Sequence, residues 1–473
     1  MKKLLLSLVV LSAGVAQAQW TEQATGFAAP SRGVNEIDIV NENVVWAVGY
    51  DGAPITVDHP TADNVQEFTR TVDGGTTWVP GMIDLGGDAT LAVNNLSATS
   101  ADVAWVSSIL GTAGGGQLYK TDDGGLSWNF ANPTGPTITT PSYTAAASFQ
   151  NTVHFFDPLI GIVQGDPTGN GTKFEIYRTT DGGITWSQIT GTALPNAITT
   201  PAATPEFGYN GGNVSAGNFF WFVTSRGNLY RTADKGLTWQ KNTVPGPITD
   251  YGGINFSNVN GRVHFSDVTG NITTAIGVLI ATTDGGTSYT RYTTADGGMT
   301  WTNAGVYTDG YQNMDFIPGT NVLVATGDDG LQYTSAYSTD LGATWNTIDG
   351  GTQRTVVAFL DGDTGWAGGF SQDATQGGIF KYTGESLGLP SVAARTQFSA
   401  TPNPTTGIIN VANADANISS VAVYDLLGKQ VYSAKFSAMN QVNVDLGQLT
   451  TGSYILKATS DAGATQTIKI MKN

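Results

Sequence analysis

A short pattern of apolar and polar positions recurs along most of the chain. Two apolar residues flank a single residue, a polar turn follows, and a large apolar residue stands seven positions after the pair. This alternation predicts a half-buried strand, a tight turn and a second strand in each unit. Seven units carry the pattern, and their flanked residues are Asp38, Ser97, His154, Asn213, His264, Asp315 and Ala358.

A second motif separates these units. It begins with Thr or Ser, continues with an aspartate and one or two glycines, and ends in Trp, as in residues 71–78. The aspartate can accept backbone N–H groups across a turn, glycine permits positive φ, and the Trp can anchor the returning strand. Such spacing indicates a radial repeat of small sheets. Six copies stand 44 to 62 residues apart, and their aspartates are Asp73, Asp123, Asp181, Asp234, Asp296 and Asp340.

The two patterns together predict an all-β fold. We expect a seven-bladed β-propeller over residues 19–384, followed by a small C-terminal β-sandwich. The seventh unit ends at Thr383 without an Asp turn or a fourth strand, while Trp20 stands in a segment similar to the strand after each Asp turn. The N-terminal strand is therefore predicted to complete the last blade and close the ring. All 11 Trp fall on these positions, which favours packing roles over sugar-stacking platforms.

The Asp turn resembles the Asp-box, or bacterial neuraminidase repeat. Proteins with this repeat include sialidases, sortilin-type receptors, xyloglucan-cleaving glycosidases and photosystem II assembly-factor-like propellers. The resemblance implies a β-propeller. Because enzymes and pure binding proteins share the repeat, it implies no single activity.

The first residues have the order of a secretory signal peptide. Lys2 and Lys3 precede an apolar run over residues 4–15, and a small-x-small site ends at Ala18. The run is shorter than the roughly 18 residues that span a bilayer, so a membrane anchor is less favoured. We predict a signal peptide over residues 1–18, cleavage between Ala18 and Gln19, and no transmembrane segment. A secreted chain without Cys fits bacterial export that does not rely on disulfides.

A different composition begins after the last repeat unit. Residues 385–397 read as a linker, and residues 398–473 alternate strands with polar turns, which predicts the sandwich. This segment starts with Pro-Asn-Pro at 402–404 and ends with a basic strand at 469–472. It closely resembles the type A sorting domain of the type IX secretion system of Bacteroidetes. The resemblance implies that the type IX machinery is a partner, and that the protein is secreted or held at the outer cell surface.

The net charge of the chain excludes one class of binding partner. The 473 residues carry 21 basic and 38 acidic side chains, a formal net charge of −17. The Lys and Arg needed for an extended nucleic-acid surface are missing, so we expect no nucleic-acid partner. From residue 398 onward the chain holds five Lys against four Asp, so the acidic character belongs to the predicted propeller.

No constellation of catalytic or cofactor-binding residues stands out. The absence of Cys excludes thiol nucleophiles and Cys-ligated zinc. His154 and His264 occupy the same repeat position two blades apart, and His59 lies in a loop, so three or four convergent zinc ligands are not evident. We therefore expect no metal, no cofactor and no catalytic residue.

The predicted ring has two faces, which differ in their loops. Asp turns and short turns share one face, and long variable loops share the other, where function is expected. We expect six flanked residues to line the mouth of a central channel at the long-loop face; the alternative is that they only satisfy backbone groups at strand ends. The six channel residues are Asp38, Ser97, His154, Asn213, His264 and Asp315.

The sequence as a whole predicts a binding or adhesion module for an extracellular glycan or protein. A sialidase-like or xyloglucanase-like glycoside hydrolase is the alternative.

Overall fold

The computed structural model is all-β within the residues that it describes. Two short 3-10 helices, η1 (Gly191–Ala193) and η3 (Ile272–Thr274), interrupt the described strands. The chain divides into two compact units, Met1–Gly388 and Leu389–Asn473. The predicted signal peptide with Ala18, and residues 388–397 of the predicted linker, lie outside the described residues. These are 19–57, 59, 62–109, 116–132, 149–167, 173–198, 206–245, 263–281, 288–311, 313–327, 333–387, 398–413, 417–425, 429–436, 439–460 and 465–473.

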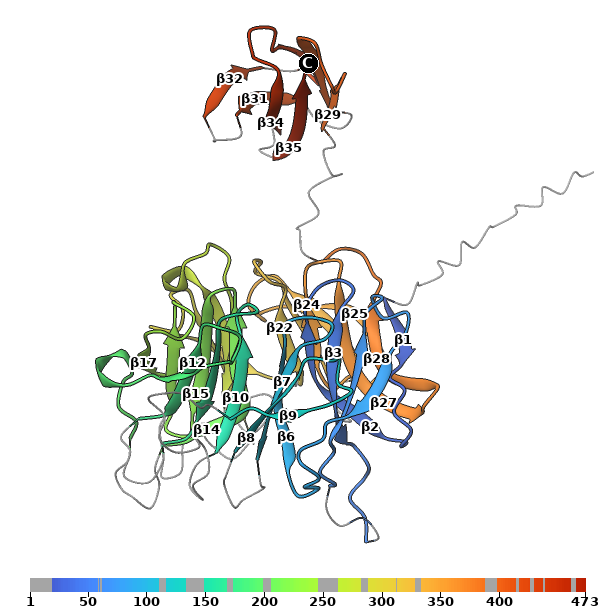
Figure 1. Ribbon diagram of the computed structural model, residues 1–473, viewed down its shortest axis with the longest axis vertical. Helices are drawn as coiled ribbons and strands as arrows, with labels where there is room; N and C mark the ends of the chain where they lie inside the picture. Colours follow the sequence, from blue (N-terminus) through green and yellow to red (C-terminus); the bar gives the residue numbers. More distant parts are fainter. Residues whose placement is uncertain are drawn as a thin grey trace, which may run out of the picture. The chain divides into compact units, whose positions relative to one another are not determined.

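The first unit contains many four-stranded antiparallel sheets that resemble propeller blades (Figure 1). Strands that follow one another in the chain are hydrogen-bonded neighbours in each of these sheets. Five sheets of the described chain have this order. They are β6 (Ala92–Ala98), β7 (Ala104–Ile109), β8 (Gln117–Thr121) and β9 (Asn129–Phe130); β10 (Gln150–Phe155), β11 (Gly161–Gly165), β12 (Glu175–Thr179) and β13 (Ser187–Gln188); β14 (Gly208–Ala216), β15 (Phe219–Thr224), β16 (Asn228–Thr232) and β17 (Gln240–Thr243); β18 (Val263–Ser266), β19 (Ile276–Ala281), β20 (Tyr289–Thr294) and β21 (Thr302–Tyr307); and β22 (Asn313–Phe316), β23 (Leu323–Thr326), β24 (Thr334–Ser338) and β25 (Asn346–Gly350).

A further, eight-stranded sheet has two halves, which are joined by the single residue pair Gly33–Phe370. Each half repeats the four-stranded arrangement of the other sheets. One half is β2 (Arg32–Ile39), β3 (Val45–Asp51), β4 (Glu67–Thr71) and β5 (Val79–Met82); the other is β26 (Val357–Phe359), β27 (Gly365–Asp373), β28 (Gln376–Tyr382) and β1 (Trp20–Ala24).

The N-terminal strand pairs with the end of the repeat region, as predicted. β1 runs antiparallel to β28, from the pair Trp20–Tyr382 to the pair Ala24–Gly378. Trp20 is buried, and its indole Nε1 donates to Ser335 Oγ at 3.0 Å. The first strands of the sheets also contact one another in chain order, from β2 through β6, β10, β14, β18 and β22 to β26, and β26 in turn contacts β2. Segments from the two ends of the unit therefore lie side by side.

The second strand of each sheet is deeply buried. All six residues of β15, Phe-Phe-Trp-Phe-Val-Thr, are buried, and so are all residues of β11 and β23. A strand that neighbouring sheets cover on both faces can be apolar throughout, without the period-two alternation of a half-solvated strand. Six of the seven large apolar residues of the repeat, such as Trp46 and Trp105, lie on these strands. The seventh, Ile272, lies in η3, just before β19.

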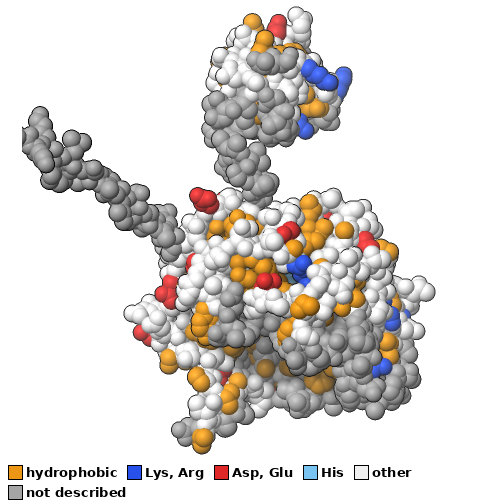
Figure 2. Space-filling view, turned by 180° about the vertical axis from the view of Figure 1, so that it is seen from behind, with side chains coloured by type: hydrophobic (Ala, Val, Ile, Leu, Met, Phe, Trp, Pro, Cys, Tyr) orange, Lys and Arg blue, Asp and Glu red, His pale blue; other side chains and the backbone are white. Residues whose placement is uncertain are grey.

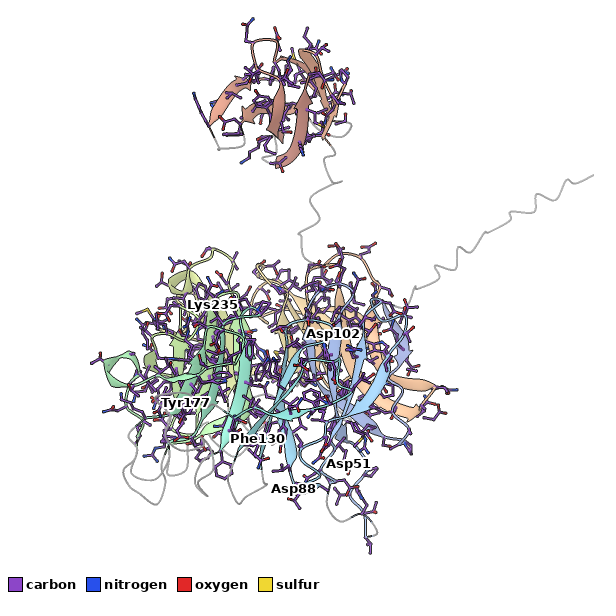
Figure 3. The ribbon with its side chains drawn as sticks, viewed as in Figure 1. Asp51, Asp88, Asp102, Phe130, Tyr177 and Lys235 are labelled. Carbon is purple, nitrogen blue, oxygen red and sulfur yellow. The ribbon has the colours of Figure 1, made fainter. Side chains whose placement is uncertain are left out.

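The turns of the first unit sort into two faces, as predicted. Backbone N–H groups of the Asp turns bond to the short turns of the same sheet, as Gly74 N does to Asn43 O at 3.0 Å. In Figure 3, Lys235 in an Asp turn and Asp102 in a short turn lie at one edge, and Asp88 in a long loop lies at the opposite edge.

The C-terminal unit is a small β-sandwich. Residues of both sheets, including Val411, Val444, Val421 and Leu456, contribute to one buried core, and two sheets that enclose one core define a sandwich. On the side shown in Figure 2, Lys and Arg side chains gather at one edge of this unit. One sheet is β29 (Phe398–Thr401), β30 (Ile408–Asn413) and β33 (Gln441–Asp445); the other is β32 (Gln430–Lys435), β31 (Ile418–Tyr424), β34 (Gly452–Ser460) and β35 (Thr465–Lys472).

Candidate functional site

Each Asp turn is held by hydrogen bonds between two side chains and the backbone. In the turn over residues 121–128, the hydroxyl of Thr121 donates to Asp123 Oδ1 at 2.9 Å and accepts the N–H of Gly125 at 2.8 Å. Asp123 Oδ1 also accepts the N–H of Ser127 at 2.9 Å. The role of the aspartate was predicted from the sequence. The leading Thr or Ser was recognised as part of the motif, but its hydrogen bonds to the aspartate and to the glycine N–H were not predicted. The same three bonds recur in the turns of Asp73, Asp181, Asp234, Asp296 and Asp340.

These hydrogen bonds stabilise the ionised form of the turn aspartates. The hydroxyl and the N–H of Ser127 lower the pKa of Asp123 to about 2. The N–H of Thr77 and the hydroxyl of Thr71 likewise lower the pKa of Asp73. A carboxylate whose pKa is far below neutral is a poor general acid or base at neutral pH.

The second glycine of most Asp turns lies against the preceding sheet. A Cβ added to Gly183 would stand 2.2 Å from the ring of Trp105, and one added to Gly125 would stand 2.1 Å from the ring of Phe68. Both glycines have positive φ, +81° and +87°. Glycine is therefore required by the backbone conformation and by the close approach of two sheets.

Two cavities lie among the first strands, and together they contain all six predicted channel residues. A cavity of about 630 Å³ is lined by Asp38, Asn213, His264 and Asp315, among others. A second cavity, of about 450 Å³, is lined by Asp38, Ser97 and His154 and by residues of the short turn after β10. Asp38 belongs to both linings.

Most of these residues lie at a different level of the ring from the one we expected. Asp38, Ser97, His154 and Asp315 are each next to last in their strands, β2, β6, β10 and β22. The first strands run from the long loops toward the short turns, so these positions lie near the short-turn face. The expected placement at the long-loop face is wrong, because the flanked residue immediately precedes the short turn along the chain.

Four of the six residues make hydrogen bonds that fasten neighbouring sheets together, and one of them, Asn213, accepts the hydroxyl of Thr152 at its Oδ1 at 3.1 Å. Asp38 Oδ2 accepts the N–H of Ala98 at 2.6 Å, and Ser97 Oγ accepts the N–H of Phe155 at 3.0 Å. Asp315 Oδ2 accepts the N–H of Phe359 at 3.4 Å. The three contacts with backbone N–H groups agree with the alternative expectation, in which the polar side chains satisfy backbone groups.

The positions two residues earlier repeat this arrangement. Glu36 Oε2 accepts the N–H of Leu96 at 2.9 Å, and Asn95 Oδ1 accepts the N–H of Val153 at 2.8 Å. Each of these side chains reaches from one first strand to the next. The first strands are thus linked by side chains at two levels.

The larger cavity is acidic. Glu36, Asp38, Asp267 and Asp315 line it, and none of its described lining residues is Lys or Arg. Burial raises the pKa of Asp38 to about 6 and the pKa of Asp315 to about 7. Such a wall is unfavourable for anions and compatible with neutral polar or positively charged groups.

The histidine of the smaller cavity is uncharged at neutral pH. Burial lowers the pKa of His154 to about 4. Its ring packs against the rings of Phe156 and Phe220, with centroid distances of 4.6 and 5.3 Å. Aromatic packing therefore accounts for this side chain without a metal.

Two further buried acidic residues could not be identified from the sequence, because they lie outside the repeated patterns. Asp166 Oδ1 accepts the N–H of Gly208 at 2.7 Å and the amide of Asn151 at 2.6 Å, and burial raises the pKa of Asp166 to about 7. Glu206 is also buried and accepts the amide of Asn228 at 2.8 Å. Asp166 directly follows β11 in the chain, and it accepts a hydrogen bond from Gly208 in β14, the first strand of the next sheet. It is therefore another link between sheets.

The tryptophans pack in the protein interior. Nine of the 11 are buried, and Trp301 and Trp345 are partly buried against apolar clusters. Trp46 and Trp128 from neighbouring sheets meet edge to face, at a centroid distance of 6.4 Å. These contacts agree with the packing roles assigned from the sequence.

Two protein-family models match parts of the chain. Residues 177–188, which contain the turn of Asp181, match the BNR/Asp-box repeat. Residues 399–473 match the secretion system C-terminal sorting domain. The chain therefore contains an Asp-box repeat and a C-terminal sorting domain of the type IX secretion system. That domain makes the secretion machinery a partner and assigns the protein to the outside of the cell.

Individual proteins show more limited likeness. The xyloglucanase Xgh74A of Acetivibrio thermocellus is 30% identical over 169 residues, which are 33% of this chain and 18% of that enzyme. YCF48 from Cyanidioschyzon merolae is 15% identical with a TM-score of 0.47, and the match covers 78% of this chain and all of that one. The GH74 xyloglucanase from Xanthomonas campestris is 16% identical with a TM-score of 0.30, over 94% and 71% of the two chains.

In the part of the chain that the structure describes, no helix has the length and apolar character needed to cross a membrane.

Proposed function

We propose that residues 19–384 form a closed seven-bladed propeller, which residues 385–397 connect to a sorting domain at 398–473. The five four-stranded sheets and the two halves of the eight-stranded sheet would supply the blades. The contacts of the first strands, from β2 through to β26 and from β26 to β2, support closure. Full closure leaves only short, protected strand edges.

We infer that this propeller is an extracellular binding or adhesion module, and that its central channel takes the ligand. The observation that carries this proposal is the cavity of about 630 Å³, which has the size of common ligand sites. Its carboxylates and the amide of Asn213 offer hydrogen bonds to glycan hydroxyls or peptide amides. The absence of Lys and Arg from the described lining favours neutral or positively charged glycans and proteins over anionic ones.

Filling the channel tests this proposal without removing an interblade hydrogen bond. Ala358 lines the cavity, so Ala358→Phe would occupy part of it. Ala343 is exposed in an Asp turn, so Ala343→Phe is the matched control. We expect the full chain to bind on a glycan or extracellular-protein array, the Ala358→Phe variant to lose at least about tenfold in affinity, and the control to bind normally. Equal binding by both variants would exclude the channel as the ligand site.

Glycoside hydrolysis is the second candidate, and the partial likeness to xyloglucanase Xgh74A favours it. Asp38 and Asp315 both face the cavity, and a raised pKa suits a general acid. Release of reducing ends from xyloglucan or a fluorogenic glycoside would support this function if Asp315→Asn or Asp38→Asn abolished it. Turnover that survives both substitutions would exclude these carboxyls as the catalytic pair.

A further inference from the structure

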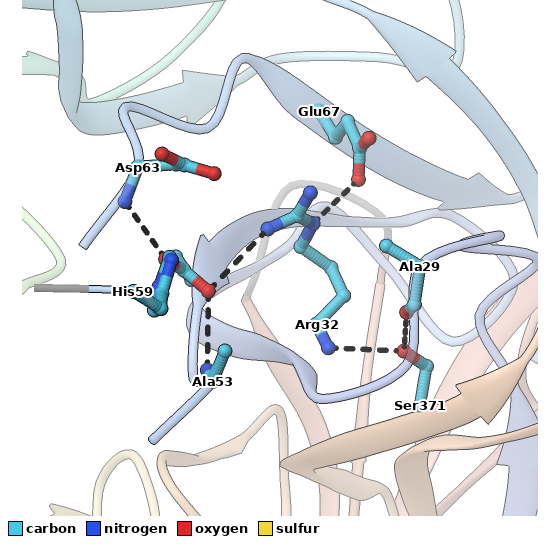
Figure 4. A network of polar contacts seen from close by, with 8 residues as sticks. Ala29, Arg32, Ala53, His59, Asp63, Glu67 and Ser371 are labelled. Atoms are coloured by element: carbon cyan, nitrogen blue, oxygen red, sulfur yellow. Dashed lines mark hydrogen bonds and ion pairs between the residues drawn. The ribbon is translucent and has the colours of Figure 1, made fainter. Parts of the chain in front are cut away.

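The loop between β3 and β4 brings a histidine and two carboxylates together, away from the channel. Asp51 ends β3, and His59 and Asp63 follow in the loop (Figure 4). One ligand atom from each side chain lies within 4.8 Å of the others. His59 Nε2 is 2.8 Å from Asp51 Oδ2, and the same oxygen accepts the N–H of Asp63 at 2.7 Å.

Asp51 is held rigidly at the base of this cluster. Its side chain is only 6% exposed, and its Oδ1 accepts the N–H of Ala53 at 3.1 Å. Arg32 Nη1 lies 4.0 Å from the same Oδ1, and Arg32 Nε donates to Glu67 Oε2 at 2.8 Å. A ligand that backbone and side-chain contacts already orient loses little freedom when an ion binds.

The charges of this group are not balanced. Asp51, Asp63 and Glu67 are acidic, and Arg32 is the cation that contacts Asp51 and Glu67. With a neutral His59, the cluster has a net charge of minus two. A divalent cation would neutralise it, and Glu67 already offsets the repulsion that Arg32 would exert on such an ion.

We propose that Asp51, His59 and Asp63 bind a divalent transition-metal ion of the zinc class. One imidazole nitrogen and two carboxylate oxygens suit this ion, and water can complete its coordination. The ion would replace the hydrogen bond between His59 and Asp51, while Asp51 Oδ2 keeps the N–H of Asp63 on its other lone pair. Ligands around a tetrahedral ion stand about 3.3 Å apart, so the exposed Asp63 has to turn inward.

Binding at this position would fix a loop that carries exposed apolar side chains. Ile55 is 61% exposed and Val57 is 97% exposed. Both lie between Asp51 and His59 in the sequence. The ion would therefore connect the loop that carries these two side chains to the end of β3.

Titration of the full chain with Zn²⁺ tests the site, using protein without a histidine tag. We expect one bound ion per chain by calorimetry and a higher midpoint of thermal unfolding when the ion is present. His59→Ala and Asp63→Asn should each weaken Zn²⁺ binding at least about tenfold. Asp88→Asn, which alters an exposed acid in the next long loop, should leave it unchanged.

Thermal unfolding without metal serves as the folding control for all three variants. No measurable Zn²⁺ binding to the parent chain would overturn the proposal. Unchanged affinity in either the His59 or the Asp63 variant, when that variant melts like the parent, would also overturn it.

Discussion

Asp38 and Ala98 join two neighbouring sheets, because the carboxylate Oδ2 of Asp38 accepts the backbone N–H of Ala98 at 2.6 Å across 60 residues of sequence. Asp38 also lines the two cavities that lie among the first strands. The side chain that faces a candidate ligand site thus also links the first strands. Substitutions in the channel therefore have to be assessed for stability before they are assessed for binding.

The three buried aspartates should lower the folding stability of the protein as the pH rises above about 4. Burial raises the pKa of Asp38, Asp166 and Asp315 to about 6, 7 and 7. A group with a raised folded-state pKa contributes stability that is fully present below its unfolded pKa, near 3.8, and lost as the pH rises through its folded pKa. We expect the midpoint of thermal unfolding to decrease between pH 4 and pH 8.

Asp315→Asn should flatten this pH profile. Asparagine keeps an oxygen for the N–H of Phe359 but has no proton to lose. At pH 8 the variant should be more stable than the parent by roughly 1 to 3 kcal/mol. A variant that loses stability with pH as steeply as the parent would show that Asp315 does not contribute to the profile.

The turn aspartates have the opposite dependence, at lower pH. Their pKa values are lowered, that of Asp123 to about 2 by the hydroxyl and N–H of Ser127. The stability from such groups is present above their unfolded pKa near 3.8 and lost as the pH falls through the folded value. Acid unfolding followed by circular dichroism should therefore begin below about pH 4.

Thr121→Val should destabilise the second Asp turn. Thr121 is fully buried, and its hydroxyl accepts the N–H of Gly125 and donates to Asp123. Valine leaves that buried N–H without its partner, at an expected cost of about 1 to 3 kcal/mol in unfolding free energy. Thr121→Ser is the control, because Ser338 makes the same bonds in the sixth turn. A Thr121→Val variant that unfolds with the same free energy as the parent would contradict this role of the hydroxyl.

Gly183→Ala should be more destabilising than Gly191→Ala. Both glycines have positive φ, +81° and +62°, so both variants incur backbone strain of about 1 to 2 kcal/mol. A Cβ at Gly191 meets nothing within 4 Å, whereas one at Gly183 meets the Trp105 ring at 2.2 Å. The collision adds about 1 to 3 kcal/mol. Similar denaturation midpoints for the two variants would contradict the close approach of the two sheets.

Trp20→Ala should open the contact between the two ends of the first unit. The indole is 4% exposed, donates to Ser335 and packs against Phe359 and Tyr382. Truncation of a buried Trp costs about 3 to 5 kcal/mol, and limited proteolysis should then cleave near the chain start. Phe130→Ala, at a side chain that is 57% exposed, is the control and should change stability little. Resistance of the Trp20 variant to proteolysis would argue against a closing role for β1.

Much of the fold could be predicted because it depends on patterns of residues that are close together in the sequence. The alternation around each flanked residue, the Asp-turn chemistry and the Trp positions are local patterns, and they correctly indicated the strands, the turns and the two faces. The similarity of the segment at Trp20 to the strands after the Asp turns predicted the pairing of β1 with β28. The Pro-Asn-Pro start and basic end likewise identified the sorting domain.

The tertiary structure decided which residues of different sheets meet. It placed Asp38 against Ala98 near the short turns and brought Asp166 against Gly208. It also brought His59 and Asp63, from one long loop, against Asp51 at the end of β3. These relationships depend on how far apart the sheets pack and how a long loop folds back on its strand. The sequence by itself determined the repeating unit, because turn and strand preferences are local. The channel and the clusters of acids were determined only by the packing of one sheet on the next. A local sequence pattern does not specify the distance between two packed sheets.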